Sequence, residues 1–259
     1  MALLPDAPPA RRVMTPSGVA LATYEWGDPD APTVVAVHGF ASSAIANWQA
    51  TGWTRELERV GLHVIAFDQR GHGVSDKPQH PSDYSMPLLV GDLLDVIDTY
   101  LIDEFVLLGY SLGARVGWHA ALELPERMTR AVLGGIPDGD PLTRFEIEEA
   151  RAFVQGGPRS GDRLTMTYLD MAAGMPGNDL GALVSLVEGM RGGAQPDPRH
   201  PPQQPVLFAT GTEDPIVDAS RRLAEATPRG EFLEIPGRNH FNAPTSKVFR
   251  ERGTAFLRP

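Results

Sequence analysis

Short apolar runs alternate with helix-like segments along most of this chain, and this alternation constrains the fold more than any other feature. The runs are rich in valine, leucine and isoleucine and are continuous, without regular polar interruptions; they span 33–39, 63–69, 105–111, 131–136, 205–211 and 231–237. Continuous runs of this length are typical of strands that are covered on both faces. Because segments with helical spacing separate them, the sequence predicts an α/β fold with a doubly wound, mostly parallel sheet and right-handed crossovers.

The N-terminal region adds to this pattern. Residues 11–27 contain two strand-like stretches around a turn at Thr15-Pro16-Ser17-Gly18. Proline and glycine favour a turn at such a junction. We therefore expect a pair of strands before the main series.

A long interval without a convincing strand lies between Ile136 and Pro205. It contains three helical patterns and ends in a proline-rich return to the sheet; the helices are expected at 142–155, 162–173 and 178–190. Four of the eight methionines lie here, and methionine side chains adapt to varied shapes. The sequence therefore predicts a core formed by 1–137 and 205–259, with a helical cap at 138–204 inserted between the runs 131–136 and 205–211.

Composition narrows the class of partner and compartment. The 259 residues include 23 basic and 33 acidic side chains, a formal net charge of −10, so nucleic-acid and anionic-membrane partners are not expected. There is no cysteine, which excludes disulfides and thiolate catalysis. The N-terminus lacks the pattern of a signal peptide and no run is long enough to span a membrane, so we expect a cytoplasmic protein. The sequence leaves open whether the protein is a monomer or a homodimer.

The segment Gly109-Tyr110-Ser111-Leu112-Gly113 joins an apolar run to a helical pattern. A serine between glycines at this kind of junction is typical of a nucleophile elbow, in which a sharp turn exposes the hydroxyl at the carboxyl edge of the sheet. Glycine and serine are also common turn residues, so the motif alone does not establish a nucleophile. Ser111 needs a base, an acid and an oxyanion hole elsewhere in the chain.

Three histidines follow Ser111: His119, His200 and His240. The base of an elbow serine comes last in the chain, after the acid. His119 lies inside the helix that follows Ser111, and His200 lies in the proline-rich return. His240 follows the last strand, in a loop at the carboxyl edge, and is therefore the predicted base.

The acid that orients this histidine is expected in the loop after the run 205–211. That loop offers Glu213, Asp214 and Asp218. We favour Asp214, because Glu213 fits an exposed position and Asp218 fits a helix cap. Asp138 or Asp140, after the preceding strand, remains an alternative.

Two backbone N–H groups should stabilise an oxyanion. One is that of Leu112, after the nucleophile, and the other is that of Phe40, in the loop after the run 33–39. His38 is expected to brace this loop. Five side chains are candidates to face the substrate, although each also fits core packing: Tyr110, Met166, Tyr168, Met171 and Phe241. No metal site or cofactor is predicted, because histidines and carboxylates do not cluster as ligands do.

In combination these motifs resemble the α/β-hydrolase fold family. The resemblance rests on five segments that occur in the family's order, and it extends from about residue 13 to 257: 38–40, 68–78, 109–113, 211–217 and 239–241. It implies a mostly parallel eight-stranded sheet with its first strands antiparallel, and a cap after strand six. It also implies that Asp68, Arg70 and His72 brace a loop.

The same resemblance separates subfamilies. Haloalkane dehalogenases and epoxide hydrolases look similar but carry aspartate at the position of Ser111, and proline iminopeptidases carry HGGPG at the oxyanion loop. We therefore expect a serine hydrolase that cleaves a carboxylic ester or lactone of a small, mainly apolar substrate through an acyl-enzyme. C–C bond hydrolysis of the meta-cleavage type, amide hydrolysis and cofactor-free perhydrolysis stay open, as does a non-catalytic ligand receptor of this fold.

Overall fold

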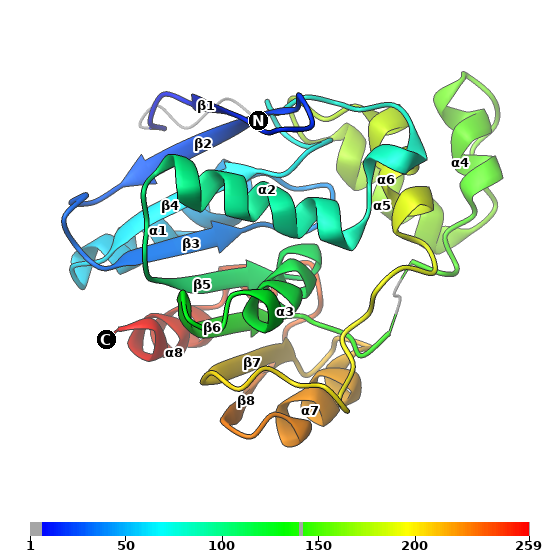
Figure 1. Ribbon diagram of the computed structural model, residues 1–259. Helices are drawn as coiled ribbons and strands as arrows, with labels where there is room; N and C mark the ends of the chain where they lie inside the picture. The colour runs from blue at the N-terminus through cyan, green and yellow to red at the C-terminus, as the bar shows by residue number, and fades with distance from the viewer. Residues whose placement is uncertain (1–6, 140–141, 259) are drawn as a thin grey trace.

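All the predicted strands lie side by side in one sheet of the computed structural model, which describes residues 7–139 and 142–258 (Figure 1). The sheet has eight strands in the order β1-β2-β4-β3-β5-β6-β7-β8. Only the β1–β2 and β2–β4 pairs are antiparallel; the other pairs are parallel. This confirms the predicted fold class. The strands are β1 (Arg11–Met14), β2 (Ala20–Trp26), β3 (Thr33–Val37), β4 (His63–Asp68), β5 (Phe105–Tyr110), β6 (Met128–Gly134), β7 (Val206–Gly211) and β8 (Gly230–Ile235).

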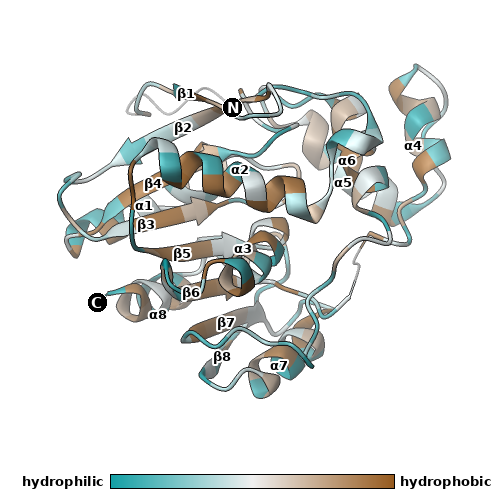
Figure 2. Cartoon of the chain, viewed as in Figure 1, coloured by the Kyte–Doolittle hydropathy of each residue, from teal (hydrophilic) through white to brown (hydrophobic). Residues whose placement is uncertain are grey.

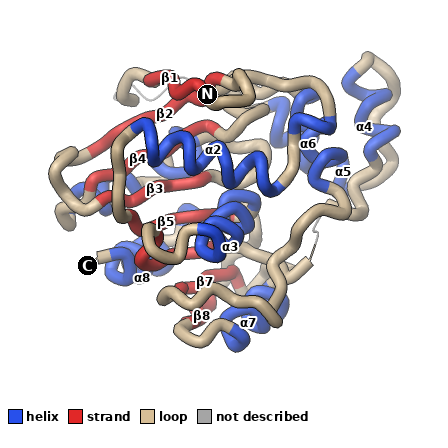
Figure 3. The backbone as a smooth tube through the Cα atoms, viewed as in Figure 1, coloured by secondary structure: helices blue, strands red, loops and turns tan. Residues whose placement is uncertain are grey.

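Helices cover both faces of the sheet (Figure 3). One face is covered by α2 (Met86–Thr99), α3 (Leu112–Glu123) and α7 (Val217–Ala226), and the other by α1 (Trp53–Arg59) and α8 (Lys247–Leu257). Three short turns of helix lie in the loops: η1 (Ile45–Gln49), η2 (Pro81–Asp83) and η3 (Ala243–Thr245). The sheet therefore has two apolar cores, one on each side.

The central strands divide their side chains between these two cores. In β3, Val35 and Val37 pack with one cluster, whereas Val34 and Ala36 pack with the other. All four side chains are fully buried. This arrangement explains why the sequences of the central strands are continuous apolar runs, which Figure 2 shows mainly in brown, as in β3 and β5.

Three helices connect β6 to β7 and lie beyond the carboxyl ends of the strands: α4 (Ile147–Val154), α5 (Arg163–Ala173) and α6 (Leu180–Met190) (Figure 1). The α6 helix packs against η2, because a Cβ on Gly189 would lie 2.1 Å from the carbonyl oxygen of Pro81. Ser185 Oγ donates to the carbonyl oxygen of Gln79 at 2.7 Å. The inserted segment is therefore anchored on the loop after β4.

The first of these helices begins later than the predicted 142–155. Arg191 Nη2 donates to the carbonyl oxygens of Leu142 and Phe145, at 3.2 and 2.5 Å. The Phe145 carbonyl therefore bonds to a guanidinium in place of a helical N–H group, and the helix starts at Ile147. Within the described part of the chain, no helix is long and apolar enough to cross a bilayer.

Candidate active site

Ser111 occupies a strained turn between β5 and α3. Its φ is 52° and its ψ is −111°, in a region that costs a non-glycine residue about 1–3 kcal/mol. The Ser111 N–H donates to the carbonyl oxygen of Gly134 at 2.8 Å, which ties the turn to β6. A Cβ on Gly109 would lie 2.5 Å from the carbonyl oxygen of Gly113, and one on Gly113 would lie 2.0 Å from that of Val37. The glycines are thus required by close backbone approach.

His240 is hydrogen-bonded to Ser111 and Asp214 at the same time. Its Nε2 lies 2.9 Å from Ser111 Oγ, and its Nδ1 lies 2.7 Å from Asp214 Oδ2. The Asp214 side chain is 2% exposed and that of His240 is 18% exposed. An ionised carboxylate only accepts hydrogen bonds, so Nδ1 donates to Asp214 and Nε2 is left to accept from the serine hydroxyl. This is the arrangement needed to activate a serine.

The other candidate acids that the structure describes form no hydrogen bond with His240. Asp138 Oδ2 accepts from Arg222 Nε at 2.7 Å, and Asp140 lies outside the described residues. Glu213 is exposed. The expected cap at Asp218 is wrong: α7 starts at Val217, so Asp218 lies in its first turn with an exposed side chain.

The other two downstream histidines do not contact Ser111. His119 is half-buried, and burial and the nearby Arg115 lower its pKa to about 4. His200 is exposed, with its Nδ1 3.1 Å from Asp197 Oδ2.

The loop after β3 lies against the elbow. A Cβ on Gly39 would be 3.4 Å from Cβ of Ser111. Within the described residues the backbone N–H groups of Phe40 and Leu112 donate to no protein acceptor, so both are available to an oxyanion. His38 is fully buried, with Nδ1 bonded to the Gly39 carbonyl at 2.8 Å and Nε2 accepting from the Gln69 N–H at 3.1 Å. Its ring therefore supports the loop and faces no substrate.

The loop after β4 braces the same region. Asp68 accepts from the backbone N–H groups of Ala44 and Val74, at 2.8 and 2.9 Å. Arg70 forms two hydrogen bonds to the Asp92 carboxylate, at 2.6 and 2.7 Å, in a buried ion pair. None of these groups lines the cavity described next.

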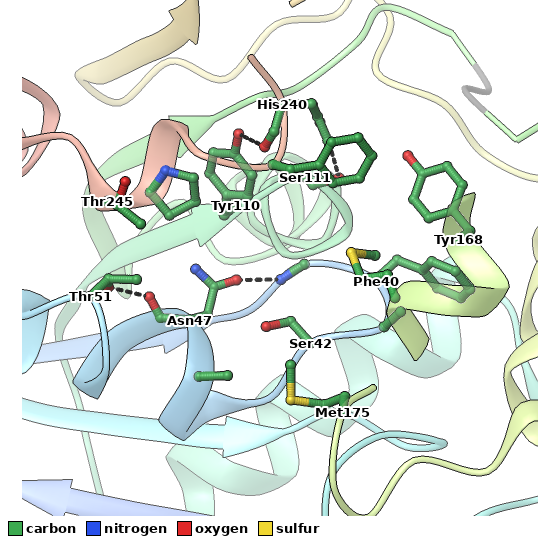
Figure 4. A pocket seen from close by; sticks show the side chains of 16 residues that line it. Phe40, Ser42, Asn47, Thr51, Tyr110, Ser111, Tyr168, Met175, His240 and Thr245 are labelled. Atoms are coloured by element: carbon green, nitrogen blue, oxygen red, sulfur yellow. Dashed lines mark hydrogen bonds between the residues drawn. The ribbon is translucent and has the colours of Figure 1, made fainter. Parts of the chain in front are cut away.

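A mainly apolar cavity of about 260 Å³ opens beside Ser111 and His240 (Figure 4). Four of the five side chains proposed from the sequence line it: Tyr110, Tyr168, Met171 and Phe241. Met166 does not, and that expectation is wrong: it lies on the opposite face of α5, 8% exposed within the core. Lining residues that sequence reasoning missed are Ala41, Ser42, Ala46, Asn47, Thr51, Met175, Pro244 and Thr245.

A second, smaller cavity of about 20 Å³ reaches Ser111 from the other side. Phe40 and Tyr168 line both cavities, with their ring centroids 5.6 Å apart. Burial and the nearby Asp214 raise the pKa of Tyr168 to about 12, so its hydroxyl stays protonated. Ser111 therefore borders two spaces, of which only the larger has room for a small organic ligand. In residues 7–139 and 142–258, no three histidines or carboxylates are grouped to hold a metal ion.

Comparisons with known proteins agree with this fold. A family model described as alpha/beta hydrolase fold matches residues 32–163. Epoxide hydrolase A from Mycobacterium tuberculosis is 31% identical over 148 residues, which are 56% of this chain and 43% of that protein. The hydrolase superfamily protein YfhM from Bacillus subtilis is 31% identical over 47% of this chain and 41% of its own length. These matches thus span less than half the length of either relative.

Solved structures match over nearly the whole chain. An enol-lactonase from Burkholderia xenovorans has a TM-score of 0.77 at 22% identity, covering 95% of this chain and 99% of that one. An epoxide hydrolase from Vigna radiata has a TM-score of 0.76 at 20% identity, covering 98% and 99%. At these identities the likeness establishes the fold.

Proposed function

The chain belongs to the α/β-hydrolase fold family, and we propose that it is a serine hydrolase of small, mainly apolar carboxylic esters or lactones. The observation that carries the proposal is the position of His240, 2.9 Å from Ser111 Oγ and 2.7 Å from Asp214 Oδ2. The free N–H groups of Phe40 and Leu112 beside the same serine add the second requirement of acyl transfer.

The mechanism follows from these positions. His240 Nε2 takes the hydroxyl proton as Ser111 Oγ bonds to the substrate carbonyl carbon. The carbonyl oxygen becomes an oxyanion that accepts from the Phe40 and Leu112 N–H groups. As the oxyanion collapses, the C–O bond to the alcohol breaks and the alcohol leaves with the proton from His240. A water molecule then gives a proton to His240 as its oxygen bonds to the acyl carbon. The bond from that carbon to Ser111 Oγ breaks, Ser111 takes the proton back from His240, and the acid is released.

The nature of the nucleophile favours esters over epoxides. Attack of an aspartate on an epoxide forms an ester, which has a carbonyl that water can attack. Attack of Ser111 on an epoxide would form an ether, and an ether has no such carbonyl. Ser111 is therefore suited to substrates that bring their own carbonyl, although several relatives are named epoxide hydrolases.

The cavity supports a small, mainly apolar substrate. Its volume is about 260 Å³, and aromatic and methionine side chains form much of its lining, including Phe40, Tyr168 and Met171. Two of these three come from α5, so the inserted helices contribute to substrate selection. The net charge of −10 supports a small-molecule partner over nucleic acid or an anionic membrane.

The test is Ser111→Ala with short p-nitrophenyl esters and γ-lactones, with Ser82→Ala, an exposed serine on η2, as the matched control. We expect Ser111→Ala to lose about 10³- to 10⁶-fold in kcat/KM and to abolish labelling by a fluorophosphonate, while the control keeps both. Wild-type turnover by Ser111→Ala would refute the proposal. An anilide and a vinylogous diketone, assayed beside the esters, test the amide and C–C alternatives.

A further inference from the structure

Asn47 of η1 carries a buried donor at the edge of the cavity. Its side chain is 6% exposed and lines the cavity that contains Ser111. Asn47 Oδ1 accepts from the backbone N–H of Gly39 at 3.0 Å. Asn47 Nδ2 is buried and has no hydrogen-bond acceptor among the described residues. In Figure 4 this nitrogen points away from Gly39, towards the side on which Tyr110 and Thr245 lie.

The orientation of the amide follows from its surroundings. The Gly39 N–H requires an acceptor, so the oxygen of Asn47 faces the loop and the NH₂ group faces the other way. The backbone is held at both ends of the residue: the Asn47 N–H donates to the Ser43 carbonyl at 2.9 Å, and Thr51 Oγ1 donates to the Asn47 carbonyl at 2.5 Å. With the backbone fixed, the side chain cannot reverse its amide group without giving up the hydrogen bond from Gly39.

Neighbouring polar side chains do not relieve this donor. The hydroxyls of Thr51 and Thr245 also line the cavity; each donates to a backbone carbonyl, those of Asn47 and Asn242, and neither accepts a hydrogen bond from Asn47 Nδ2. A buried donor without an acceptor costs free energy that a ligand oxygen would return on binding. This makes the Asn47 amide a recognition element of the cavity and not only a brace.

Resting on the proposed ester hydrolysis, we infer that Asn47 is a specificity-determining residue that donates from Nδ2 to an oxygen acceptor of the substrate. The preferred substrates are esters or lactones with an ether, hydroxyl or carbonyl oxygen besides the scissile ester group. Through Oδ1 the same side chain positions the Gly39–Phe40 loop, which supplies one N–H of the oxyanion hole. One amide thus has two separable effects, one on every substrate and one on oxygen-bearing substrates alone.

Paired substrates separate these effects. Two pairs of p-nitrophenyl esters are used: butanoate with methoxyacetate, and pentanoate with 3-methoxypropanoate. In each pair the second ester has an oxygen where the first has a methylene group. Each is assayed with wild type, Asn47→Leu and Asn47→Asp. Dividing the wild-type kcat/KM by that of a variant, for each ester, removes the intrinsic reactivity of the acyl group.

We expect Asn47→Leu to lower kcat/KM for both members of a pair, with a further loss of about 10- to 100-fold for the oxygen-bearing member of at least one pair. Asn47→Asp keeps an acceptor for the Gly39 N–H but loses the donor. It should therefore show the same further loss of kcat/KM for the oxygen-bearing ester. Fluorophosphonate labelling of Ser111, which uses the oxyanion hole, should be slower in Asn47→Leu than in Asn47→Asp. Gln203→Glu, an exposed amide-to-carboxylate change, is the control and should behave as wild type.

Equal losses for both members of both pairs in Asn47→Leu would overturn the inference, because the amide would then act only on the loop. A wild type that turns over neither member of any pair would overturn it together with the proposed function. The two failures are distinguishable, since the first keeps ester turnover and the second lacks it.

Discussion

The hydroxyl of Tyr110 donates to the backbone carbonyl oxygen of His240 at 2.6 Å. The residue directly before the nucleophile thus holds the loop that carries the base. The two rings lie close, with centroids 5.5 Å apart. Gly135 lies against both rings: a Cβ added to it would be 3.1 Å from the Tyr110 hydroxyl oxygen and 3.2 Å from Cε1 of His240. The distance between Ser111 and His240 therefore depends on Tyr110.

Removing this hydrogen bond should slow the reaction more than it weakens binding. We expect Tyr110→Phe to lower kcat by about 5- to 20-fold, since loss of one positioning bond misplaces the base. KM should change by less than about threefold, because the ring still lines the cavity. Tyr100→Phe is the control, as its hydroxyl bonds to Thr23 Oγ1 away from the cavity. A kcat for Tyr110→Phe equal to that of Tyr100→Phe would contradict the positioning role.

The acid can be identified by comparing two aspartates. Asp214→Asn should lower kcat by about 10³- to 10⁴-fold, because the amide no longer favours the tautomer that leaves Nε2 as an acceptor. Asp138→Asn removes an ion pair to Arg222 at the protein surface and should change kcat by less than about twofold. Steady-state kinetics on one p-nitrophenyl ester measures both, and the opposite ranking would reassign the acid to Asp138.

Asn178 connects the α5–α6 turn to two loops of the active-site region. Its Oδ1 accepts from the Gly73 N–H at 3.0 Å, and its Nδ2 donates to the Ala41 carbonyl at 3.1 Å. Asn178→Ala should raise KM about 3- to 10-fold by loosening the lining near Met175, with little change in global unfolding. Hydrogen exchange in residues 174–180 should speed up in this variant. Arg159→Ala, which removes an exposed ion pair elsewhere in the inserted segment, should leave that exchange unchanged.

Much of the candidate site could be predicted because chain order and strand ends determine it. Ser111, Asp214 and His240 each follow a strand of a mostly parallel sheet, and such strands end at one edge. The structure brings these three side chains into one hydrogen-bonded row. Their catalytic roles remain proposals that the substitutions above test.

Which side chains line the cavity could not be predicted from the sequence, because this depends on tertiary packing. The α5 helix has one exposed polar face, formed by Arg163, Thr167 and Asp170, and apolar side chains on the rest of its surface. Nothing local therefore indicates that Met166 and Leu169 pack into the core while Tyr168 and Met171 line the cavity. Asn47 was missed because its role depends on η1 folding back to Gly39, eight positions earlier in the chain. A polar residue shortly after a predicted oxyanion loop is the only local signal for it.

The elbow glycines predict a sharp difference in stability between two substitutions. A methyl group on Gly113 would meet the Val37 carbonyl oxygen at 2.0 Å, so Gly113→Ala should destabilise the protein by at least about 2–3 kcal/mol. A methyl group on Gly91 in α2 would meet no atom within 4 Å, so Gly91→Ala should be neutral or stabilise by up to about 1 kcal/mol. Urea unfolding measures both, and equal midpoints would contradict the close approach.

Stability should fall in acid through the buried pair His38 and His72, whose ring centroids lie 5.0 Å apart. Burial lowers the pKa of both imidazoles, and His38 lowers that of His72 further. Below about pH 6.5 the unfolded chain therefore binds protons that the folded protein excludes. The free energy of unfolding should be nearly constant above about pH 7 and decrease below pH 6.5 by up to about 1.4 kcal/mol per pH unit for each histidine.

The slope of unfolding free energy against pH, and not the absolute stability, tests whether His38 and His72 cause the acid sensitivity. His72→Gln should reduce the slope of unfolding free energy against pH between about pH 6.5 and 5, measured by urea denaturation, even if the variant is less stable at every pH. His80→Gln is the control, because that ring is exposed to water. A slope in His72→Gln as steep as in wild type would mean that other groups cause the acid sensitivity.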